Sequence, residues 1–538
     1  MRERADALRN MVESMEKQPA AREMAYPHAK PVRPVTVEGC ELPPIEKTMH
    51  VLKLSKTQPE LDCAWVLNMF QIDNFPETCL ALYMADEYNP IDFIIVNTGL
   101  YFMFHGYLYH HPDKAEEYLG MARLCGANIE TALSSLPLHL PATDEVLEAL
   151  LLGAFYTIEL GKPSLGWILS CKASEICQSL GYHRADTYAN DSSPAMRRKR
   201  YLFWMTYAMD KSLSLRLGRS STIHDYDVTV SEPRDDETQH SPELSIFTLW
   251  IHESRTQGQI YELLYCPEAL RQSETVRKSR VKLLVGQLDK LDTLTDNVLE
   301  KWRSSFGSVS PAEITDFFVL SDRVLRRSTR TLVHRAVPNP PGSPTTFTVE
   351  CIQTARETLA LHQECMTVLE RAGAGLFSTY MSWTILFAPF VPFIVLFCQV
   401  IETRDKADLA RLEAFVSSLQ PYTASSEAVE RLRRLFQVLH SVASQFVESQ
   451  TGQGRDGQQP STVDTCLATL GFSSQFIPSS QESEYETGAT SFASDPAFQR
   501  GVNPMIWMGN GTELEDWFYN NQYMMGFMEG TAPEEGSY

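Results

Sequence analysis

The chain has 538 residues, of which 43% are hydrophobic, so it can bury a core larger than that of one ordinary domain. Its formal net charge of −21 argues against a surface that binds nucleic acid broadly. The eleven cysteines include no C-x2-C pair, so clustered thiolates for a structural zinc site are missing from the sequence, and their mostly apolar surroundings are typical of buried free thiols.

The first 18 residues predict a short helix with a hydrophobic seam at steps of three and four, made by Ala5, Leu8, Val12 and Met15. Two heptads are marginal in water, so we interpret the segment as a frayed helix. The alternative is a coiled-coil remnant that supports a homodimer. Residues 19–44 are rich in proline and charge and are predicted to form a linker.

Helices are expected from residue 45 onward, and an early one reads IDFIIVNTGLYFMFHGYLYHH. It carries three histidines, His105, His110 and His111, which raise the question of a metal site. A histidine at the edge of an aromatic helix more often lies hydrogen-bonded in the core or at the surface. We therefore favour a structural role for these histidines and expect no metal here.

Three helices are predicted between residues 146 and 233. Hydrophobic residues recur at helical spacing from Leu147 to Ile158, and Gly161 then ends the first helix. The second helix ends at Gly181. Pro194 suits the first turn of a third helix, which is apolar nearly all round and is therefore predicted to be central and buried.

The helix pair contains the motifs LGKPSLGWIL and ASEICQSLGYHR, the third helix contains RRKRYLFWMTYAMD, and LGRSSTIHDYDVTVSEP follows it. With these motifs the stretch resembles the middle homology region of the fungal-specific transcription factors, regulators that usually carry a six-cysteine zinc cluster near the N-terminus. Ser220 stands where such proteins usually have proline. The residues that match the family pattern or its core are Gly161, Trp167, Gly181, His183, Arg184, Arg200, Phe203, Trp204, Asp210, Gly218, Arg219, Asp225 and Asp227.

The resemblance implies an all-α regulatory domain over about residues 45–448, an irregular helical array of two stacked lobes at about 45–233 and 240–448. It also implies a nuclear regulator of transcription, and such regulators often control metabolic gene clusters. Because the sequence lacks a zinc-cluster pattern, we expect this chain to have no zinc-cluster module of its own and not to bind DNA alone. Its partners would be the transcription machinery or a separate DNA-binding protein.

Two charged motifs in this stretch have alternative interpretations. Asp210, Asp225 and Asp227 could suggest a cation site, but we favour a structural role in which Asp210 pairs with Arg219. The loop around Asp225 would then cap the next segment of the chain. The basic run 197–200 could be a nuclear localisation signal or a phosphate contact. Because it leads directly into a buried helix, we favour a solvated first turn with local ion pairs.

Residues 372–401 carry no charge and are numerous enough to span a bilayer. Pro389 and Pro392 interrupt the run, and interior helix proline costs about 3 kcal/mol. No basic cluster marks a flank of the run. We therefore predict a buried core helix and no membrane span.

Residues 449–500 are rich in glycine, glutamine, serine and threonine, which predicts a disordered linker. In the tail at 501–538, acidic residues surround aromatic ones, a composition typical of activation domains. The alternative is a tail that packs back on the fold. The candidate activation residues are Glu513, Glu515, Asp516, Trp517, Phe518, Tyr519 and Phe527.

The common catalytic motifs G-x-S-x-G, G-x-x-x-x-G-K-[ST], H-E-x-x-H and G-x-G-x-x-G do not occur, so no enzyme activity and no cofactor are expected. The sequence therefore predicts a transcription regulator of fungal type, controlling a metabolic or secondary-metabolite gene set. The alternative is a helical ligand-sensing or partner-binding co-regulator that acts on a separate DNA-binding factor. A small-molecule effector is compatible with either role.

Overall fold

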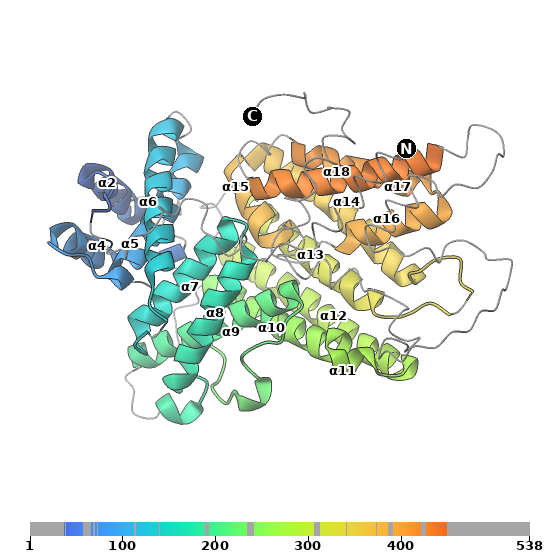
Figure 1. The fold of residues 1–538 in the computed structure, drawn as a ribbon, viewed down its shortest axis with the longest axis horizontal. Helices are drawn as coiled ribbons and strands as arrows, with labels where there is room; N and C mark the ends of the chain where they lie inside the picture. The colour runs from blue at the N-terminus through green and yellow to red at the C-terminus, as the bar shows by residue number, and fades with distance from the viewer. Residues whose placement is uncertain are drawn as a thin grey trace, which may run out of the picture. The chain divides into compact units, whose positions relative to one another are not determined.

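The computed structural model describes residues 37–448, apart from 38, 58–65, 68–69, 71, 73, 112–113, 139, 189–192, 234–241, 306–311, 341, 373, 386–390 and 421–426. Within these ranges the secondary structure is helical and contains no strand, which confirms the predicted all-α class (Figure 1). The predicted N-terminal helix, the linker after residue 448 and the candidate activation tail lie outside the described residues, as does most of the linker at 19–44.

The described residues divide into two compact units. The larger contains residues 37–338 and 348–392, and the smaller contains residues 339–347 and 393–448. The lobe boundary expected near residues 233–240 falls inside the larger unit. There, helices α9 (Ser193–Leu217) and α10 (Pro242–Ile260) pack against each other on either side of that point.

The larger unit begins with a series of helices in which neighbours along the chain pack together. Helix α5 lies on α6, α7 on α8, and α8 on α9 (Figure 1). The helices before α9 are α2 (Ile45–Thr57), α4 (Phe75–Met84), α5 (Pro90–His110), α6 (Ala115–Ser135), α7 (Asp144–Glu159) and α8 (Pro163–Ser179). Short 3-10 helices follow α8 at Ala185–Tyr188 and α9 at Asp225–Asp227.

The second half of this unit continues the same pattern after α10. A π-helical segment at Tyr261–Tyr265 extends α10, and another, at Met381–Ile385, directly follows α15 (Ala374–Tyr380). Helix α10 packs on α12, α12 on α13, and α13 on α14. The helices are α11 (Pro267–Leu270), α12 (Glu274–Ser305), α13 (Ala312–Arg335), α14 (Val349–Ala372) and α15 (Ala374–Tyr380).

Two glycines let α7 and its neighbours approach closely. A Cβ added at Gly153 of α7 would lie 2.9 Å from a Leu133 methyl carbon on α6. A Cβ added at Gly166 of α8 would lie 3.0 Å from the Thr157 hydroxyl oxygen on α7. Real Cβ atoms seldom come this close to a neighbour, so the spacing of α6, α7 and α8 depends on these two glycines.

Helix α9 is the central buried helix that its all-round apolar sequence predicts. From Arg200 to Leu217 every residue is buried, and the Trp204 side chain is only 1% exposed. The ring of Trp204 lies edge-on to the rings of Phe203, at 5.2 Å between centroids, and Tyr207, at 5.1 Å. A helix with no solvent face must be covered on several sides, and α7, α8 and α10 all contact it.

Acidic residues of α12 face arginines of α13. Arg326 is 3% exposed and donates to Asp292 at 3.0 Å, whereas Arg323 reaches Asp296 near the surface, also at 3.0 Å. Arg330 pairs with both Asp289 and Asp292. Because three arginines of α13 meet acidic residues of α12 across the interface, with Asp292 shared by Arg326 and Arg330, these pairs help to fix the register of the two helices.

The smaller unit consists of helices α16 (Val391–Thr403), α17 (Lys406–Leu419) and α18 (Glu427–Glu448), with α16 counted from Phe393. Phe393 packs against Phe415 of α17 and Phe436 of α18, at 5.6 and 4.2 Å between ring centroids. Residues 393–401 are buried, as the core interpretation of the uncharged run predicts. No helix among the described residues is long and apolar enough to cross a membrane.

Candidate functional site

The candidate site extends along α9 and the segment 218–233 that follows it, here called the exit segment, and the family pattern also includes the glycines at the ends of α7, α8 and α9. Each of the three helices ends at a glycine with positive φ: 72° at Gly161, 74° at Gly181 and 63° at Gly218. After each glycine, the next amide bonds to a carbonyl five residues back, as in Lys162 N to Thr157 O at 2.8 Å. This is the Schellman arrangement, which satisfies carbonyls at the helix end and favours a residue without a Cβ.

Asp210 holds the turn that follows α9. Its carboxylate is fully buried and accepts hydrogen bonds from the amides of Thr222, at 3.0 Å, and Ile223, at 3.1 Å. It also accepts from the hydroxyls of Ser221 and Thr222. Our prediction that Asp210 pairs with Arg219 is therefore wrong. A carboxylate with four donors from one turn needs no cation beside it.

Arg219 instead lies over the indole ring of Trp167 on α8, with 4.3 Å between the guanidinium carbon and the ring centroid. Two residues of the family pattern are thus brought together by a cation–π contact. The arginine keeps its solvent access, since it is only partly buried, while its flat group covers a flat ring. The contact ties the end of α9 to α8.

Asp227 joins the segment after α9 to the segment after α8. It forms an ion pair with Arg184 and lies 3.4 Å from Nε2 of His183. The His183 carbonyl accepts from the amides of Thr229 and Val230 at 2.9 and 3.2 Å. Burial lowers the pKa of His183, with Arg184 adding to this and Asp227 opposing it. The imidazole is therefore mainly uncharged near pH 7, and the residue joins the segments after α8 and α9.

Asp225 binds two groups of α9. It accepts from the Tyr207 hydroxyl at 2.7 Å and lies 3.1 Å from Nζ of Lys211. Burial and the nearby carboxylate raise the pKa of Tyr207, so the hydroxyl stays protonated and donates. Asp225 and Asp227 thus serve as structural acceptors. Among the described residues, no group of three or more histidines, cysteines or acids is placed to hold a metal ion.

His105 lies in the aromatic packing of α5. Its ring lies against that of Tyr101, at 4.6 Å between centroids, and burial lowers its pKa to about 4. It is therefore an uncharged part of that packing at neutral pH.

Lys211 is a buried residue that the sequence did not single out. Its side chain has no exposed surface, and its Nζ lies 5.3 Å from the centroid of the Tyr207 ring. Gly258 on α10 makes room for it, because an added Cβ there would lie 2.6 Å from Cδ of Lys211. The sequence feature that could have identified Lys211 is its position among apolar residues of a helix predicted to be buried. A buried ammonium needs a carboxylate partner, which here is Asp225.

The basic run at the start of α9 forms local contacts. Arg198 donates to Glu148 of α7 at 2.9 Å, and the ammonium of Lys199 lies 5.7 Å from the centroid of the Tyr182 ring. Arg200 is 7% exposed. The ion pair of Arg198 agrees with the predicted local pairing, but the run is not the solvated first turn that we predicted, because α9 begins at Ser193 and Arg200 is buried.

We expect the contribution of Glu148 and Glu253 to the free energy of unfolding to fall as the pH rises from about 5 to about 7. Burial raises the pKa of Glu148 and of Glu253 to about 7, with Arg198 and Arg326 opposing the shift. In each case the folded protein binds a proton more tightly than the unfolded chain, whose glutamates have a pKa near 4.5. The contribution of these two carboxyls is therefore greatest below that range and falls as they ionise. Melting temperatures across this range, measured on the wild type and on the Glu148→Gln and Glu253→Gln double variant, test this. A slope that the double variant leaves unchanged would contradict it.

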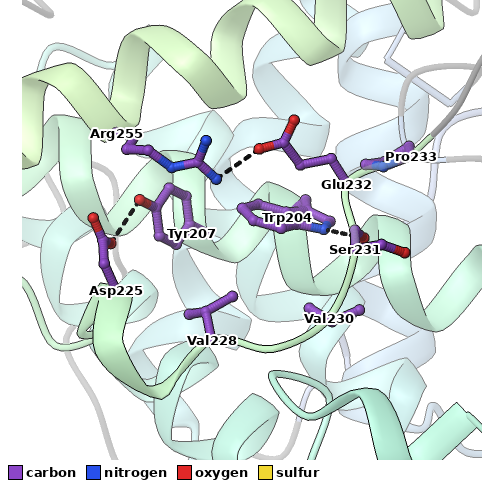
Figure 2. Close-up of a pocket in the computed structure, with 9 residues that line it drawn as sticks. All are labelled: Trp204, Tyr207, Asp225, Val228, Val230, Ser231, Glu232, Pro233 and Arg255. Carbon is purple, nitrogen blue, oxygen red and sulfur yellow. Dashed lines mark hydrogen bonds and ion pairs between the residues drawn. The ribbon is translucent and has the colours of Figure 1, made fainter.

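A cavity of about 430 Å³ opens beside α9 (Figure 2). Helix α9 contributes Trp204 and Tyr207, and α10 contributes Arg255. The indole N–H of Trp204 donates to the Ser231 carbonyl at 3.0 Å, so the exit segment is fastened to α9 beside the cavity. The residues of this segment that line it are Asp225, Val228, Val230, Ser231, Glu232 and Pro233. The family pattern had singled out Trp204 and Asp225, whereas Arg255 and Glu232 were not anticipated.

Part of this helical region matches a known protein family. Residues 99–302, from the middle of α5 into α12, match the fungal specific transcription factor domain. The chain therefore contains a domain of that family. The wider range 45–448 expected from the sequence stays a prediction.

The relatives are fungal regulators. An uncharacterized transcriptional regulatory protein of Schizosaccharomyces pombe is 25% identical over 282 residues, which cover 49% of this chain and 42% of that protein. Protein STB5 of Saccharomyces cerevisiae is 28% identical over 160 residues, 29% of this chain and 21% of the relative. The Dehydrocurvularin biosynthesis regulator of Aspergillus terreus is 25% identical over 169 residues, 29% and 23% of the two chains. The matches thus span less than half of each relative's length. No solved structure matches the chain significantly.

Proposed function

We propose that this chain is a nuclear regulator of transcription that controls a metabolic or secondary-metabolite gene set. The observation that carries the proposal is the match of residues 99–302 to the fungal specific transcription factor domain. The metabolic target set is supported by one relative, whose name is Dehydrocurvularin biosynthesis regulator.

In this proposal the helical region is a scaffold for regulation and not a catalyst. The acidic residues that the sequence singles out, Asp210, Asp225 and Asp227, all accept from named partners within the fold. A general base or nucleophile needs a free position beside an open site. Asp210 and Asp227 do not line the cavity, and Asp225, which does, is engaged with Tyr207 and Lys211.

The chain reaches DNA through a separate module in our proposal. The 538 residues contain no C-x2-C pair, and their net charge is −21. Phosphate contacts require clustered lysines and arginines, and the basic run 197–200 is engaged with Glu148 and with the Tyr182 ring. A DNA-binding protein or the transcription machinery is the expected partner.

The acidic-aromatic tail is the proposed activation segment. Residues 505–530, fused to a heterologous DNA-binding domain, are expected to activate a reporter gene. The double change Trp517→Ala and Phe518→Ala should abolish that activation, because the aromatic rings supply the apolar contact with a partner while Glu513, Glu515 and Asp516 supply solubility and steering. Reporter transcription, with fusion abundance and nuclear location measured alongside, checks this. A fusion that is nuclear and abundant but silent would refute the assignment.

The second candidate is a ligand-sensing co-regulator that acts on a separate DNA-binding factor. The cavity beside Trp204 favours it, because a pocket of this size suits a small molecule. Co-purification of the chain with a zinc-cluster protein, together with a silent tail fusion, would favour this role over direct activation.

A further inference from the structure

We infer that the cavity beside α9 binds a small aromatic carboxylate, whose carboxylate takes the place of Glu232 on Arg255. The inference deepens the proposed regulatory function, on which it rests, by naming the chemistry of an effector. Its test is a binding measurement that needs neither DNA nor a reporter, so its failure would leave the proposed function standing.

The size of the cavity suits a single aromatic ring with a short side chain. Its volume of about 430 Å³ is near the lower end of the range for small-molecule sites, which is about 300–1,000 Å³. Such sites combine apolar walls with a few polar groups that fix the orientation of the ligand. Both kinds of surface are present here.

One wall offers apolar surface. Val228 and Val230 lie two residues apart, so their side chains share one side of an extended segment, and Figure 2 shows both below the rings of Trp204 and Tyr207. The polar ends of these rings are satisfied within the protein, at the Ser231 carbonyl and the Asp225 carboxylate. Both rings are only 1% exposed, so they form the buried side of the cavity, and the partly buried Val228 and Pro233 offer a ligand the accessible apolar surface.

The opposite wall carries a cation that a ligand can reach. The Arg255 guanidinium pairs through one terminal nitrogen with Oε1 of Glu232 at 2.7 Å, and its carbon lies 5.6 Å from the centroid of the Trp204 ring. About a third of the Arg255 side chain is exposed. A guanidinium has five N–H donors in a planar fork that fits a carboxylate bidentately. Arg255 can therefore bind a ligand carboxylate through two nitrogens, whereas it pairs with Glu232 through one.

The carboxylates of the site are already neutralised, which disfavours a cationic ligand. Asp225 accepts from Tyr207 and lies 3.1 Å from the Lys211 ammonium. Glu232 has Arg255 on one oxygen and Nε2 of His252 at 3.3 Å from the other. A ligand ammonium would have to displace a buried lysine or an arginine, whereas a ligand carboxylate displaces only a part-exposed glutamate, which keeps His252 as a partner.

Replacement of Glu232 by the ligand carboxylate on Arg255 would change the contacts of residues 231–233. Glu232 is separated by one residue from Val230 of the apolar wall and is followed directly by Pro233. Releasing Glu232 from Arg255 removes one of its two contacts with α10 and leaves the contact with His252, while the bond from Trp204 to Ser231 keeps the segment on α9. Ligand binding is thereby coupled to the position of residues 231–233.

Three compounds of one shape and different charge test the inference. They are 3-phenylpropanoate, 3-phenylpropanamide and 3-phenylpropylamine, titrated into the full chain at neutral pH by calorimetry and ligand-observed NMR. We expect the acid to bind, and the amide and the amine to bind about tenfold more weakly or not at all, because only the acid gives Arg255 a charge-assisted bidentate partner. Equal or tighter binding of the amine, or no binding of the acid, would overturn the inference.

Two variants assign the site. Arg255→Gln should weaken binding of 3-phenylpropanoate about tenfold, and Glu232→Gln should strengthen it severalfold, because the competing anion is removed. The control is Arg323→Gln on α13, which also breaks a part-exposed ion pair, at 3.0 Å from Asp296 but away from the cavity, and should leave affinity unchanged. A gain of affinity cannot come from misfolding, so weaker binding in Glu232→Gln would refute the exchange even if Arg255→Gln proved unstable.

Discussion

Replacing Trp204 with alanine is expected to lower the free energy of unfolding by about 3–5 kcal/mol. The indole is 1% exposed and contacts the rings of Phe203 and Tyr207, so its removal leaves a cavity in the centre of the larger unit. It also removes the donor to the Ser231 carbonyl, which lies 3.0 Å from the indole nitrogen. The substitution therefore affects both the core and the segment that leaves α9.

Chemical and thermal unfolding measure this effect. Tyr226→Ala is the matched control, because Tyr226 belongs to the same stretch but is 86% exposed, and its loss should change stability by no more than about 0.5 kcal/mol. Trp204→Phe should fall between the two, since it keeps a ring but not the donor. An unchanged melting temperature for Trp204→Ala would refute the central position of α9.

The second large effect is expected at Asp210. Asp210→Ala leaves the amides of Thr222 and Ile223 and the Thr222 hydroxyl without their acceptor, whereas the Ser221 hydroxyl can still donate to the Ile223 carbonyl. An unmade bond to a buried group costs about 1–3 kcal/mol, so we expect a total loss of at least about 3 kcal/mol. The turn at 221–223 should lose its order, and the aromatic carboxylate site, which the same exit segment lines, should weaken.

Asp210→Asn keeps the shape of the side chain and removes its charge. The amide oxygen still accepts hydrogen bonds, while the amide nitrogen now faces donors. It should cost less than alanine but more than Asp227→Asn, which breaks a part-exposed ion pair with Arg184 and should cost no more than about 1 kcal/mol. Unfolding measurements on the three variants give the order. Equal stability of Asp210→Ala and Asp227→Asn would show that the turn does not depend on Asp210.

The sequence was sufficient for features that are encoded locally. The ends of α7 and α8 were predicted because Gly161 and Gly181 are the residues that a left-handed cap favours, and the structure shows that Gly218 ends α9 in the same way. The burial of α9 followed from its lack of a polar face, and the core role of residues 393–401 followed from the prolines and the missing charges.

Features that depend on distant segments could not be predicted in the same way. Asp210 and Arg219 are close in sequence and opposite in charge, which suggested an ion pair. The turn at 221–223 instead presents its own donors to Asp210, and α8 presents Trp167 to Arg219. The cavity also needed the fold, because Arg255 comes from α10 and Glu232 from the exit segment. Similarly, nothing near Lys211 in the sequence indicates that Gly258 leaves space for it.

The most direct test of the proposed regulator is a selection of bound sequences from a random duplex DNA library by the purified 538-residue chain. If the regulator reaches its genes through a separate DNA-binding module, no sequence should be enriched. Any binding should then be non-specific and should weaken as salt is added, with a dissociation constant of about 10⁻⁴ M or weaker at physiological salt. The same chain fused to a zinc-cluster domain should enrich that domain's site, which shows that the preparation is competent. An enriched motif that the unfused chain protects at nanomolar concentration in moderate salt would contradict the need for a separate module.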